Sequence, residues 1–578
     1  MRSILLLLLL VALDLAAALK RFDLNITLDQ INPDCSDYAG YALVANHQLP
    51  GPVLEVEEGE RVQVTVRNFL PRSTPSNITG AGMNDVTVHF HGIRQYSSAH
   101  SDGVPFLTQQ PIPPGAEFTH YFHVVNQVGT YFYHAHVGLQ EQTLFGPFII
   151  HSKQEQLSEK YPEHIISLSE WWHASRTALE EYFLGPEFEF IPEAQSVLIN
   201  GRTLYNTDRP SPQNKDVCGG YTLLEVDRGK TYRLRVIGAS TFRTLGFGIA
   251  HHNLTIIEVD GERVKPYSVP FLEVTPGQRF SVLLHAVQPV GDYTMATNRR
   301  WAEDVSRGSN GMGILRYNSE HDATSTTTSH ISNDNNNDKA PVFKLPPNKP
   351  YFPLADSTHW IWSELEPLYG VDPVVNRPAS RTIKLRATDM IFPTGERRWF
   401  INGIAYTEPE RPILMDILQI KRQRPIMSAN TFHNGYDPYL ATYPLYHYEI
   451  VDFVLQSTHI PGEPCRSHPW HTHGHSHWEI AHGLGEYDEF EHSDIRNNPH
   501  PIQKDVTLGY PGIDPDDDIV NGTLATEPVG CGWSKIRILA DNPGVWLLHC
   551  HNSPHMLQGM MVVLEESPEL INDYLQSS

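Results

Sequence analysis

The stretch GVWLLHCHNSPHMLQGM, which begins at Gly544, places one cysteine between two histidines and adds a histidine and a methionine downstream. Successive side chains of a strand point to opposite faces, so a strand here would direct Cys550 to one side and His549 and His551 to the other. Thiolate and imidazole are donors that bind transition metals. The spacing therefore predicts one strand that serves two different metal sites.

Three further pairs share the His-x-His spacing, which puts both imidazoles of a pair on one side of a strand. They are His89 with His91, His134 with His136, and His471 with His473. A single pair of this kind is usually a surface coincidence, but four pairs in repeat-related positions are not. Their eight imidazoles are too many for one mononuclear site and indicate a cluster of about three metals with open positions for a small molecule.

The remaining donors are Cys550, His555, Met560 and the distant His468. Two imidazoles, one thiolate and a weak thioether are the ligand set of a blue-copper electron-transfer site. Zinc is the competing metal, but structural zinc sites close with four ligands, often several cysteines, and only one cysteine is available here. The alternative for Met560 is an ordinary core residue, because methionine readily fills cores.

The elements that must position these residues are short strands. Apolar and polar residues alternate in runs such as VLEVEEGERVQVTVRNFLP and YTLLEVDRGKTYRLRVIG, separated by Gly, Pro and Asn. The 25 Tyr, 23 Phe, 44 Pro and 40 Gly also suit an all-β protein with many turns. Helical periodicity is short, with one candidate helix around SRTALEEYF.

Internal repeats divide the chain. GTYFYHAH from Gly129 aligns with GVWLLHCH, and GDYTMATN from Gly291 is a third copy with Ala296 and Asn298 in place of the histidines. We therefore expect three related β-domains, of which the middle one carries no ligands. The expected divisions are a first domain 19–155, a second domain 156–318, a polar low-complexity linker 319–340 and a third domain 341–578.

The first 18 residues have an early arginine, an apolar run and small residues before Leu19, which is typical of a cleaved signal peptide. No later stretch is apolar enough to span a bilayer. The formal net charge of -24 argues against nucleic acid or an anionic membrane as a partner. We expect a secreted, extracellular glycoprotein, and its sequons lie at Asn25, Asn77, Asn253 and Asn521.

The motifs HFHG, YHAH, HPWHTHGH and HCHNSPHMLQGM resemble the four copper signatures of the multicopper oxidases, in order and across the whole chain after residue 18. The resemblance implies three cupredoxin-like Greek-key β-sandwich domains and four copper ions per chain. A small-molecule reductant would give electrons to a type 1 copper, and a trinuclear cluster between the first and third domains would reduce O₂ to water. The implied ligands are His468, Cys550, His555 and axial Met560 for type 1, His89 and His471 for type 2, and His91, His134, His136, His473, His549 and His551 for the type 3 pair.

Within the family the chain is most similar to the ascorbate oxidases. SLSEWWHAS resembles a segment of theirs that contributes a tryptophan to the substrate pocket, which implies substrate-binding roles for Trp171 and Trp172. Such an aromatic surface suits an ene-diol or a phenol, and the alternative for both residues is an ordinary core aromatic pair. Ascorbate or a similar ene-diol is therefore the first expectation for the donor. The alternatives are a laccase-like phenol oxidase, a ferroxidase that uses acids such as Glu180, Glu181, Glu187 and Glu189, and a non-catalytic copper-binding or cell-wall protein.

Departures from the family pattern concern the cysteines and one acid. TQQPIPP lacks the cysteine of one family disulfide, while Cys35 and Cys218 match the positions of another, which joins domains one and two. Cys465 and Cys531 remain as disulfide candidates, and four cysteines allow three connectivities.

Ser553 stands where the family places an acid credited with supplying protons to the cluster. Asp102, in SDGVP, matches a second family acid near the type 2 copper, and we expect it to take a larger share of that task. The alternative for Asp102 is a turn residue before Gly103.

Overall fold

The computed structural model describes residues 19–72, 82–153, 161–205, 218–302, 308–318, 341–357, 361–420, 435–514, 516, 518–520 and 523–572. The predicted signal peptide 1–18, the predicted linker 319–340 and the sequons at Asn77 and Asn521 lie outside the described residues. Across the described ranges, no helix has the length and apolar character needed to cross a membrane.

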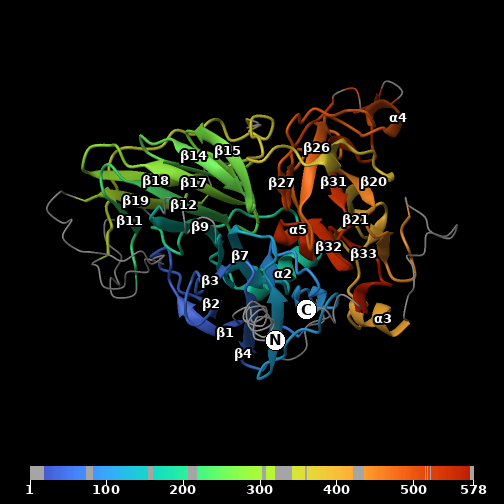
Figure 1. Cartoon of the computed structure of the whole chain (residues 1–578), viewed down its shortest axis with the longest axis horizontal. Coiled ribbons are helices and arrows are strands. Elements are labelled where there is room, and N and C mark those ends of the chain that lie inside the picture. Colours follow the sequence, from blue (N-terminus) through green and yellow to red (C-terminus); the bar gives the residue numbers. More distant parts are fainter. Residues whose placement is uncertain are drawn as a thin grey trace, which may run out of the picture.

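Strands are by far the commonest regular element of the described chain, at 45% strand against 8% helix, as the alternating pattern predicted. They form three pairs of sheets, which we call the first sandwich (β1–β8), the second sandwich (β9–β19) and the third sandwich (β20–β33). In Figure 1 the first is blue, the second is green, and the third runs from orange to red.

The first sandwich pairs two four-stranded sheets with orders β2-β1-β4-β6 and β3-β8-β7-β5. Apolar residues of both sheets, such as Val64 and Phe148, meet in one buried cluster. The strands are β1 (Leu19–Ile31), β2 (Gly40–Ala45), β3 (Leu54–Glu57), β4 (Arg61–Asn68), β5 (Val88–His91), β6 (Glu117–His123), β7 (Gly129–Ala135) and β8 (Phe145–His151).

The second sandwich has sheet orders β10-β9-β12-β17-β14-β15 and β11-β19-β18-β13-β16, again with a shared apolar core. Its strands are β9 (Glu163–Trp171), β10 (Ser196–Ile199), β11 (Thr222–Val226), β12 (Thr231–Gly238), β13 (Leu245–Ile249), β14 (Leu254–Val259), β15 (Glu262–Val269), β16 (Leu272–Val274), β17 (Arg279–His285), β18 (Asp292–Arg299) and β19 (Met312–Tyr317).

The third sandwich has sheet orders β22-β21-β20-β24-β31-β26-β27 and β23-β33-β32-β25-β28, and a separate two-stranded ribbon joins β29 to β30. Its strands are β20 (Arg381–Ile391), β21 (Arg397–Ile401), β22 (Ile404–Ala405), β23 (Thr442–Leu445), β24 (Ile450–His459), β25 (His468–Thr472), β26 (His477–Gly483), β27 (Gln503–Lys504), β28 (Val506–Gly509), β29 (Ile519–Val520), β30 (Thr523–Leu524), β31 (Val529–Leu539), β32 (Gly544–Cys550) and β33 (Met561–Glu566).

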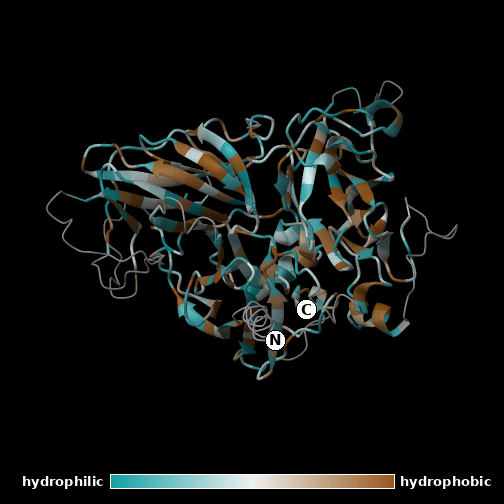
Figure 2. Ribbon diagram, in the orientation of Figure 1, coloured by the Kyte–Doolittle hydropathy of each residue, from teal (hydrophilic) through white to brown (hydrophobic). Residues whose placement is uncertain are grey.

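Sheet topology confirms the internal repeat. β7, β18 and β32, which carry the three aligned segments, occupy the same place in the second sheet of each sandwich. In each case a parallel pair lies on one side, formed by β3 with β8, β11 with β19, and β23 with β33. Figure 2 shows hydrophobic and hydrophilic residues interspersed along the strands of the sandwiches. β7 and β32 are buried along their whole length, so both faces of these two strands are covered.

Helices are few and short among the described residues. The candidate helix is confirmed as α2 (Arg176–Leu184), and the hydroxyl of Ser175 caps its N-terminus by accepting a hydrogen bond from the Ala178 N–H. The other helical segments are η1 (Ala99–Ser101), η2 (Gln140–Gln142), η4 (Pro373–Asn376), α3 (Ile413–Ile420), α4 (Glu489–His492) and α5 (Ser553–Leu557). α2 and α5 lie against each other between the sandwiches (Figure 1).

Candidate metal centres

Four strands bring the eight paired histidines together. In the first sandwich β5 pairs with β7 so that His89 lies opposite His134, and in the third β25 pairs with β32 so that His471 lies opposite His549. Phe90, between its two histidines, turns the other way into the first core. The alternation predicted from the sequence therefore holds, and the histidines are left facing the space between the two sandwiches.

The first of three groups of ring nitrogens centres on His91. Its Nδ1 lies 3.4 Å from His134 Nε2 and 3.1 Å from His551 Nε2. The opposite nitrogen, His91 Nε2, lies 3.2 Å from a carboxylate oxygen of Asp505. Because Nε2–H donates to that carboxylate, Nδ1 is the lone-pair nitrogen and points at the other two imidazoles.

The second group consists of His473 and His549 of the third sandwich and His136 of the first. His473 Nε2 lies 3.1 Å from His549 Nε2, and ring nitrogens of His136, His473 and His549 all lie within 4.8 Å of one another. His473 Nδ1 donates to Asp102 Oδ2 at 2.9 Å. This hydrogen bond leaves His473 Nε2 as the lone-pair atom.

The third group contains His89 and His471, whose rings lie 5.8 Å apart. The Nδ1–H groups donate to main-chain oxygens, from His89 to Asp102 at 2.8 Å and from His471 to Asp505 at 2.9 Å. The Nε2 atoms of both rings are buried and have no hydrogen-bond partner in the part of the chain that the structure describes. His89, His471 and His473 each offer a ring nitrogen within 4.8 Å of the others, so a metal ion bound there would satisfy buried acceptors that otherwise have no partner.

A separate site surrounds Cys550. Its Sγ lies 3.7 Å from His468 Nδ1 and 3.8 Å from His555 Nδ1. Met560 is fully buried in the same apolar cluster as Cys550, and its main-chain oxygen accepts a hydrogen bond from the Cys550 N–H at 3.0 Å. The ring of Trp399 lies about 5 Å from both histidine rings, at 5.1 Å and 5.0 Å between centroids, and covers the site.

Burial sets the protonation states of these groups. It lowers the pKa of His468 to about 3, and it lowers the pKa of His473, His549 and His551 well below the ordinary value, with further depression by neighbouring imidazoles. Neutral imidazole is the form that binds a metal. Burial raises the pKa of the Cys550 thiol, so the thiolate needs a cation beside it.

Two buried carboxylates, of Asp505 and Glu141, lie at the cluster without belonging to any of the copper motifs. Asp505 contacts His91 as described, and Glu141, in η2, accepts a hydrogen bond from His134 Nδ1 at 3.0 Å. The Glu141 side chain also accepts a hydrogen bond from the Ser553 hydroxyl. The serine at the position of the family acid is therefore hydrogen-bonded to a carboxylate from the first sandwich, that of Glu141.

Little in the sequence could have found either acid. Glu141 and Ser553 are 412 residues apart, and a buried glutamate in QEQ looks like any polar turn residue. Asp505 directly precedes β28, which pairs with β25, but that pairing is visible only in the folded chain.

The tryptophan pair divides between two apolar clusters because adjacent residues point to opposite sides. Trp171 packs with Ala42 and Val44 of the first sandwich, whereas Trp172 belongs to a cluster that reaches Leu557 in α5. Both side chains are buried, at 4% exposure. Trp172 thus shares a cluster with a residue of α5, the helix that carries His555, and substrate contact by either tryptophan stays a prediction.

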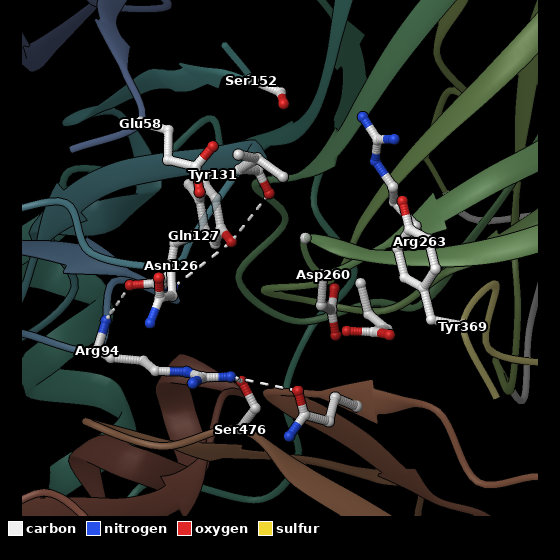
Figure 3. Close-up of a pocket in the computed structure, with 14 residues that line it drawn as sticks. Glu58, Arg94, Asn126, Gln127, Tyr131, Ser152, Asp260, Arg263, Tyr369 and Ser476 are labelled. Atoms are coloured by element: carbon white, nitrogen blue, oxygen red, sulfur yellow. Dashed lines mark hydrogen bonds between the residues drawn. The ribbon is translucent and has the colours of Figure 1, made fainter. Parts of the chain in front are cut away.

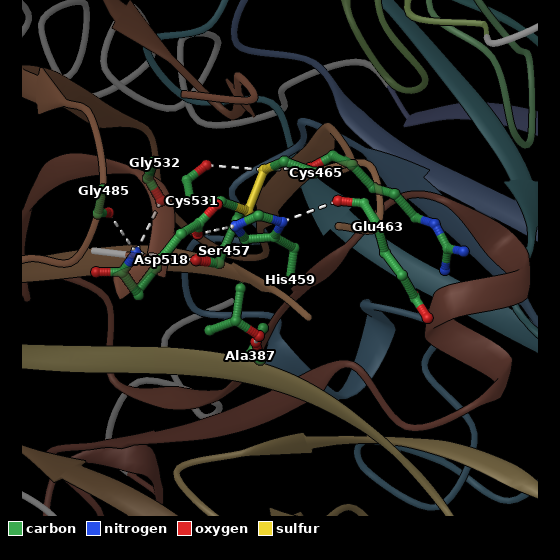
Figure 4. The surroundings of a disulfide bond; sticks show 12 residues. Ala387, Ser457, His459, Glu463, Cys465, Gly485, Asp518, Cys531 and Gly532 are labelled. Carbon is green, nitrogen blue, oxygen red and sulfur yellow. Dashed lines mark hydrogen bonds and ion pairs between the residues drawn. A yellow bond between two sulfur atoms is a disulfide. The ribbon is translucent and has the colours of Figure 1, made fainter. Parts of the chain in front are cut away.

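Four cysteines form two disulfides, Cys35–Cys218 and Cys465–Cys531, which settles the connectivity that the sequence left open. The first joins the first and second sandwiches, as the family resemblance implied. Figure 4 shows the second, where Cys465 Sγ lies 2.8 Å from the main-chain oxygen of Cys531. Cys550 has a free thiol. Of the two described sequons, Asn253 is exposed and Asn25 is half-buried within β1.

Comparison with known proteins decides the family. Three family models, each described as multicopper oxidase, match residues 25–155, 162–320 and 406–570, which is most of the chain. The chain belongs to the multicopper oxidase family. The family identity implies that it binds copper and acts as an oxidoreductase.

The relatives of this multicopper oxidase span several activities. An L-ascorbate oxidase of Cucumis sativus is 28% identical over 571 residues, covering 93% of this chain and 88% of the relative. Laccase-1 of Agaricus bisporus is 29% identical over 575 residues, covering 96% of this chain and 91% of the relative.

Among solved structures, Fet3p, a multicopper oxidase that functions in iron import, matches with a TM-score of 0.72 and 25% identity over 97% of this chain and 95% of that one. A laccase from Botrytis aclada matches with a TM-score of 0.73 and 25% identity over 97% and 92%.

The donor sets fit the copper that the family implies. The cluster offers converging imidazole nitrogens, and those at His89, His136 and His471 have no competing hydrogen bonds within the described residues. The Cys550 site offers one thiolate and two imidazoles within 4.8 Å of one another. Soft thiolate combined with imidazole suits copper, and the absence of a second cysteine ligand disfavours structural zinc.

Proposed function

We propose that the chain is a secreted copper oxidase that couples four one-electron oxidations of ascorbate, or a similar ene-diol, to the reduction of O₂ to water. The observation that carries the proposal is the strand β32, on which Cys550 faces one donor set and His549, with His551 just beyond, faces the other. When bound, copper supplies single-electron transfer at the Cys550 site and multi-electron reduction of O₂ at the histidine cluster.

Each group of residues would hold one copper ion. His468, Cys550 and His555, with Met560 as a weaker fourth ligand, would hold the type 1 ion, and His89 and His471 would hold the type 2 ion. The type 3 pair takes His91, His134 and His551 for one ion and His136, His473 and His549 for the other. Cys550 is covalently joined to a ligand of each type 3 ion, which provides a through-bond path between the two centres.

Two carboxylates would manage protons at the cluster. Asp102 Oδ2 holds the Nδ1–H of His473, and Glu141 Oε2 holds the Nδ1–H of His134, so acids flank the cluster on two different ligands. Both side chains are almost fully buried. Reduction of O₂ to water consumes four protons, and buried acids within hydrogen-bond reach are suited to pass them on.

Charge around the type 1 site favours an anionic donor. After burial and His468, the groups that depress the pKa of His555 are the cations Arg466, Arg243 and Arg397. Arg243 pairs with Glu193 and Arg397 pairs with Asp389, whereas Arg466 has no ion-pair partner among the described residues and is the cation whose charge is not offset. A positive field attracts ascorbate, an anion at neutral pH, and repels Fe(II).

The acids that suggested a ferroxidase support it less well. Glu180 is buried and bound by Arg176, with both carboxylate oxygens 2.8 Å from Nη1, so its charge is neutralised. Glu181, Glu187 and Glu189 are exposed and lie on or just after α2. Solvated acids of this kind bind iron weakly unless they converge.

A laccase-like phenol oxidase is the second candidate, supported by the similarity to laccase-1. Steady-state kcat/KM with ascorbate, a neutral phenol and Fe(II) on one preparation separates the three activities. We expect ascorbate to give the largest value, and we expect Arg466→Gln to lower kcat/KM for ascorbate about tenfold while leaving kcat/KM for the phenol unchanged. The donor assignment is wrong if ascorbate gives the smallest value.

Amino-terminal sequencing of protein recovered from culture medium tests secretion and the predicted removal of residues 1–18.

A further inference from the structure

The second sandwich carries no histidine ligand, yet it touches the histidine cluster. The turn before β17 brings Gly277 against His91 and His551, in the positive-φ region at +85°. A Cβ on Gly277 would lie 2.7 Å from His91 Cε1 and 3.2 Å from His551 Cδ2. Only glycine fits this contact, because a side chain would displace two imidazoles.

Two residues further on, Arg279 forms a bidentate ion pair with Asp505. Nη1 donates to Oδ1 and Nη2 donates to Oδ2, each at 2.6 Å. The same Oδ1 lies 3.2 Å from His91 Nε2 and 3.5 Å from His471 Nδ1. One carboxylate thus connects a cation of the second sandwich to two cluster histidines.

The Arg279–Asp505 ion pair is buried, and further contacts hold the guanidinium in place. Arg279 also donates to the main-chain oxygens of Gly277 at 2.9 Å and Thr130 at 3.2 Å, and its Nη1 lies 3.3 Å from Asp260 Oδ1. The Arg279 side chain has 0% exposure and that of Asp505 has 2%. Planar bidentate pairing of this kind fixes orientation as well as charge, which lysine cannot reproduce.

Asp260, which contacts Arg279, also lines a polar pocket of about 240 Å³. Figure 3 shows that the pocket is lined by all three sandwiches, with Arg94 of the first reaching Ser476 of the third and Asp260 on the side of the second. The ion pairs therefore lie where the three sandwiches meet, between this pocket and the cluster.

We propose that Arg279 is a positioning residue for the copper cluster, which acts through Asp505 to hold His471 and His91 in ligating orientation. The copper-free second sandwich thereby controls occupancy of the type 2 position. The inference rests on the copper ligation proposed above, and it assigns to the second sandwich a role that its lack of ligands conceals.

The test uses full-length, copper-loaded protein and three variants. Arg279→Lys keeps the charge but loses the bidentate geometry, and Asp505→Asn keeps the shape but loses the charge. Arg300→Lys is the matched control, because Arg300 is equally buried in the second sandwich and its Nε donates to Glu273 at 2.8 Å. Copper per chain, the paramagnetic resonance of type 2 copper and the visible type 1 band are measured after dialysis against a chelator.

We expect Arg279→Lys and Asp505→Asn to lose type 2 copper at least tenfold more readily than wild type and to retain the type 1 band. Arg300→Lys should retain both signals. The proposal is overturned if Arg279→Lys keeps its type 2 signal, or if the control loses copper to the same extent. Failure of the proposed function is a different outcome, because the wild-type protein itself would then lack the copper signals. If Arg279→Lys fails to fold, the type 2 signal of Asp505→Asn serves as the test: its loss supports the proposal and its retention overturns it.

Discussion

Replacing Glu141 by glutamine should slow turnover by removing a proton-carrying group from the cluster. The change is nearly isosteric, and the amide oxygen can still accept a hydrogen bond from the Ser553 hydroxyl or from His134. What disappears is the negative charge and the capacity to pass a proton. Packing around this buried side chain is therefore largely preserved.

The expected size follows from the number of acids at the cluster. A positioned general acid or base contributes about 10²- to 10⁴-fold, and Asp102 and Glu141 contact different histidines, so either can serve partly without the other. We expect kcat for Glu141→Gln to fall about 100-fold, which corresponds to about 2.7 kcal/mol of activation free energy. Asp102→Asn should have a similar effect, and the double variant should approach the loss of about 10⁴-fold.

The assay compares two half-reactions. Oxygen uptake at saturating donor should fall, whereas anaerobic bleaching of the type 1 band by the donor should match wild type, because Glu141 lies at the cluster. Glu55→Gln is the control, since Glu55 pairs with His151 at 3.2 Å elsewhere in the first sandwich. Exchanging the two residues, Glu141→Ser with Ser553→Glu, should recover at least a tenth of the lost rate. The reasoning fails if Glu141→Gln turns over within twofold of wild type.

Three other changes have defined outcomes. Cys550→Ser should abolish the visible type 1 band and donor oxidation while the histidine cluster stays loaded, as measured by absorption and copper analysis. Removing the Cys35–Cys218 disulfide, whose cysteines are 183 residues apart, should cost about 5 kcal/mol of unfolding free energy in the chain-entropy estimate and lower Tm in calorimetry. Burial raises the pKa of Glu262 to about 7, so the folded protein holds a proton there that the unfolded chain releases near its ordinary pKa of 4.5. Stability should therefore fall as pH rises from about 4.5 to about 7, and Tm profiles of Glu262→Gln should lack this part of the decline.

Much of the fold, and the convergence of most of the candidate ligand residues, could be predicted from the sequence because both depend on local periodicity. The two-residue period of a strand placed His549 and Cys550 on opposite faces, and the aligned segments at Gly129, Gly291 and Gly544 fall on equivalent strands. These features need no knowledge of which sandwich packs against which.

The remaining features depend on contacts between distant segments. Glu141 meets Ser553 across 412 residues, and Arg279 meets Asp505 across 226. Buried ion pairs and hydrogen bonds of this kind have no periodic signature, so a single sequence does not reveal them. The missing acid at Ser553 was visible in the sequence, but the carboxylate that reaches it could be found only in the folded chain.

The central claim is that two copper centres joined through β32 reduce O₂ to water with electrons from a small-molecule donor. Copper analysis combined with O₂ uptake on one purified preparation tests it most directly. We predict about four copper ions per chain, one O₂ consumed for every four electrons supplied by ascorbate, and no release of hydrogen peroxide. A fully copper-loaded protein that consumed no O₂, or that released one hydrogen peroxide for every two electrons, would contradict it.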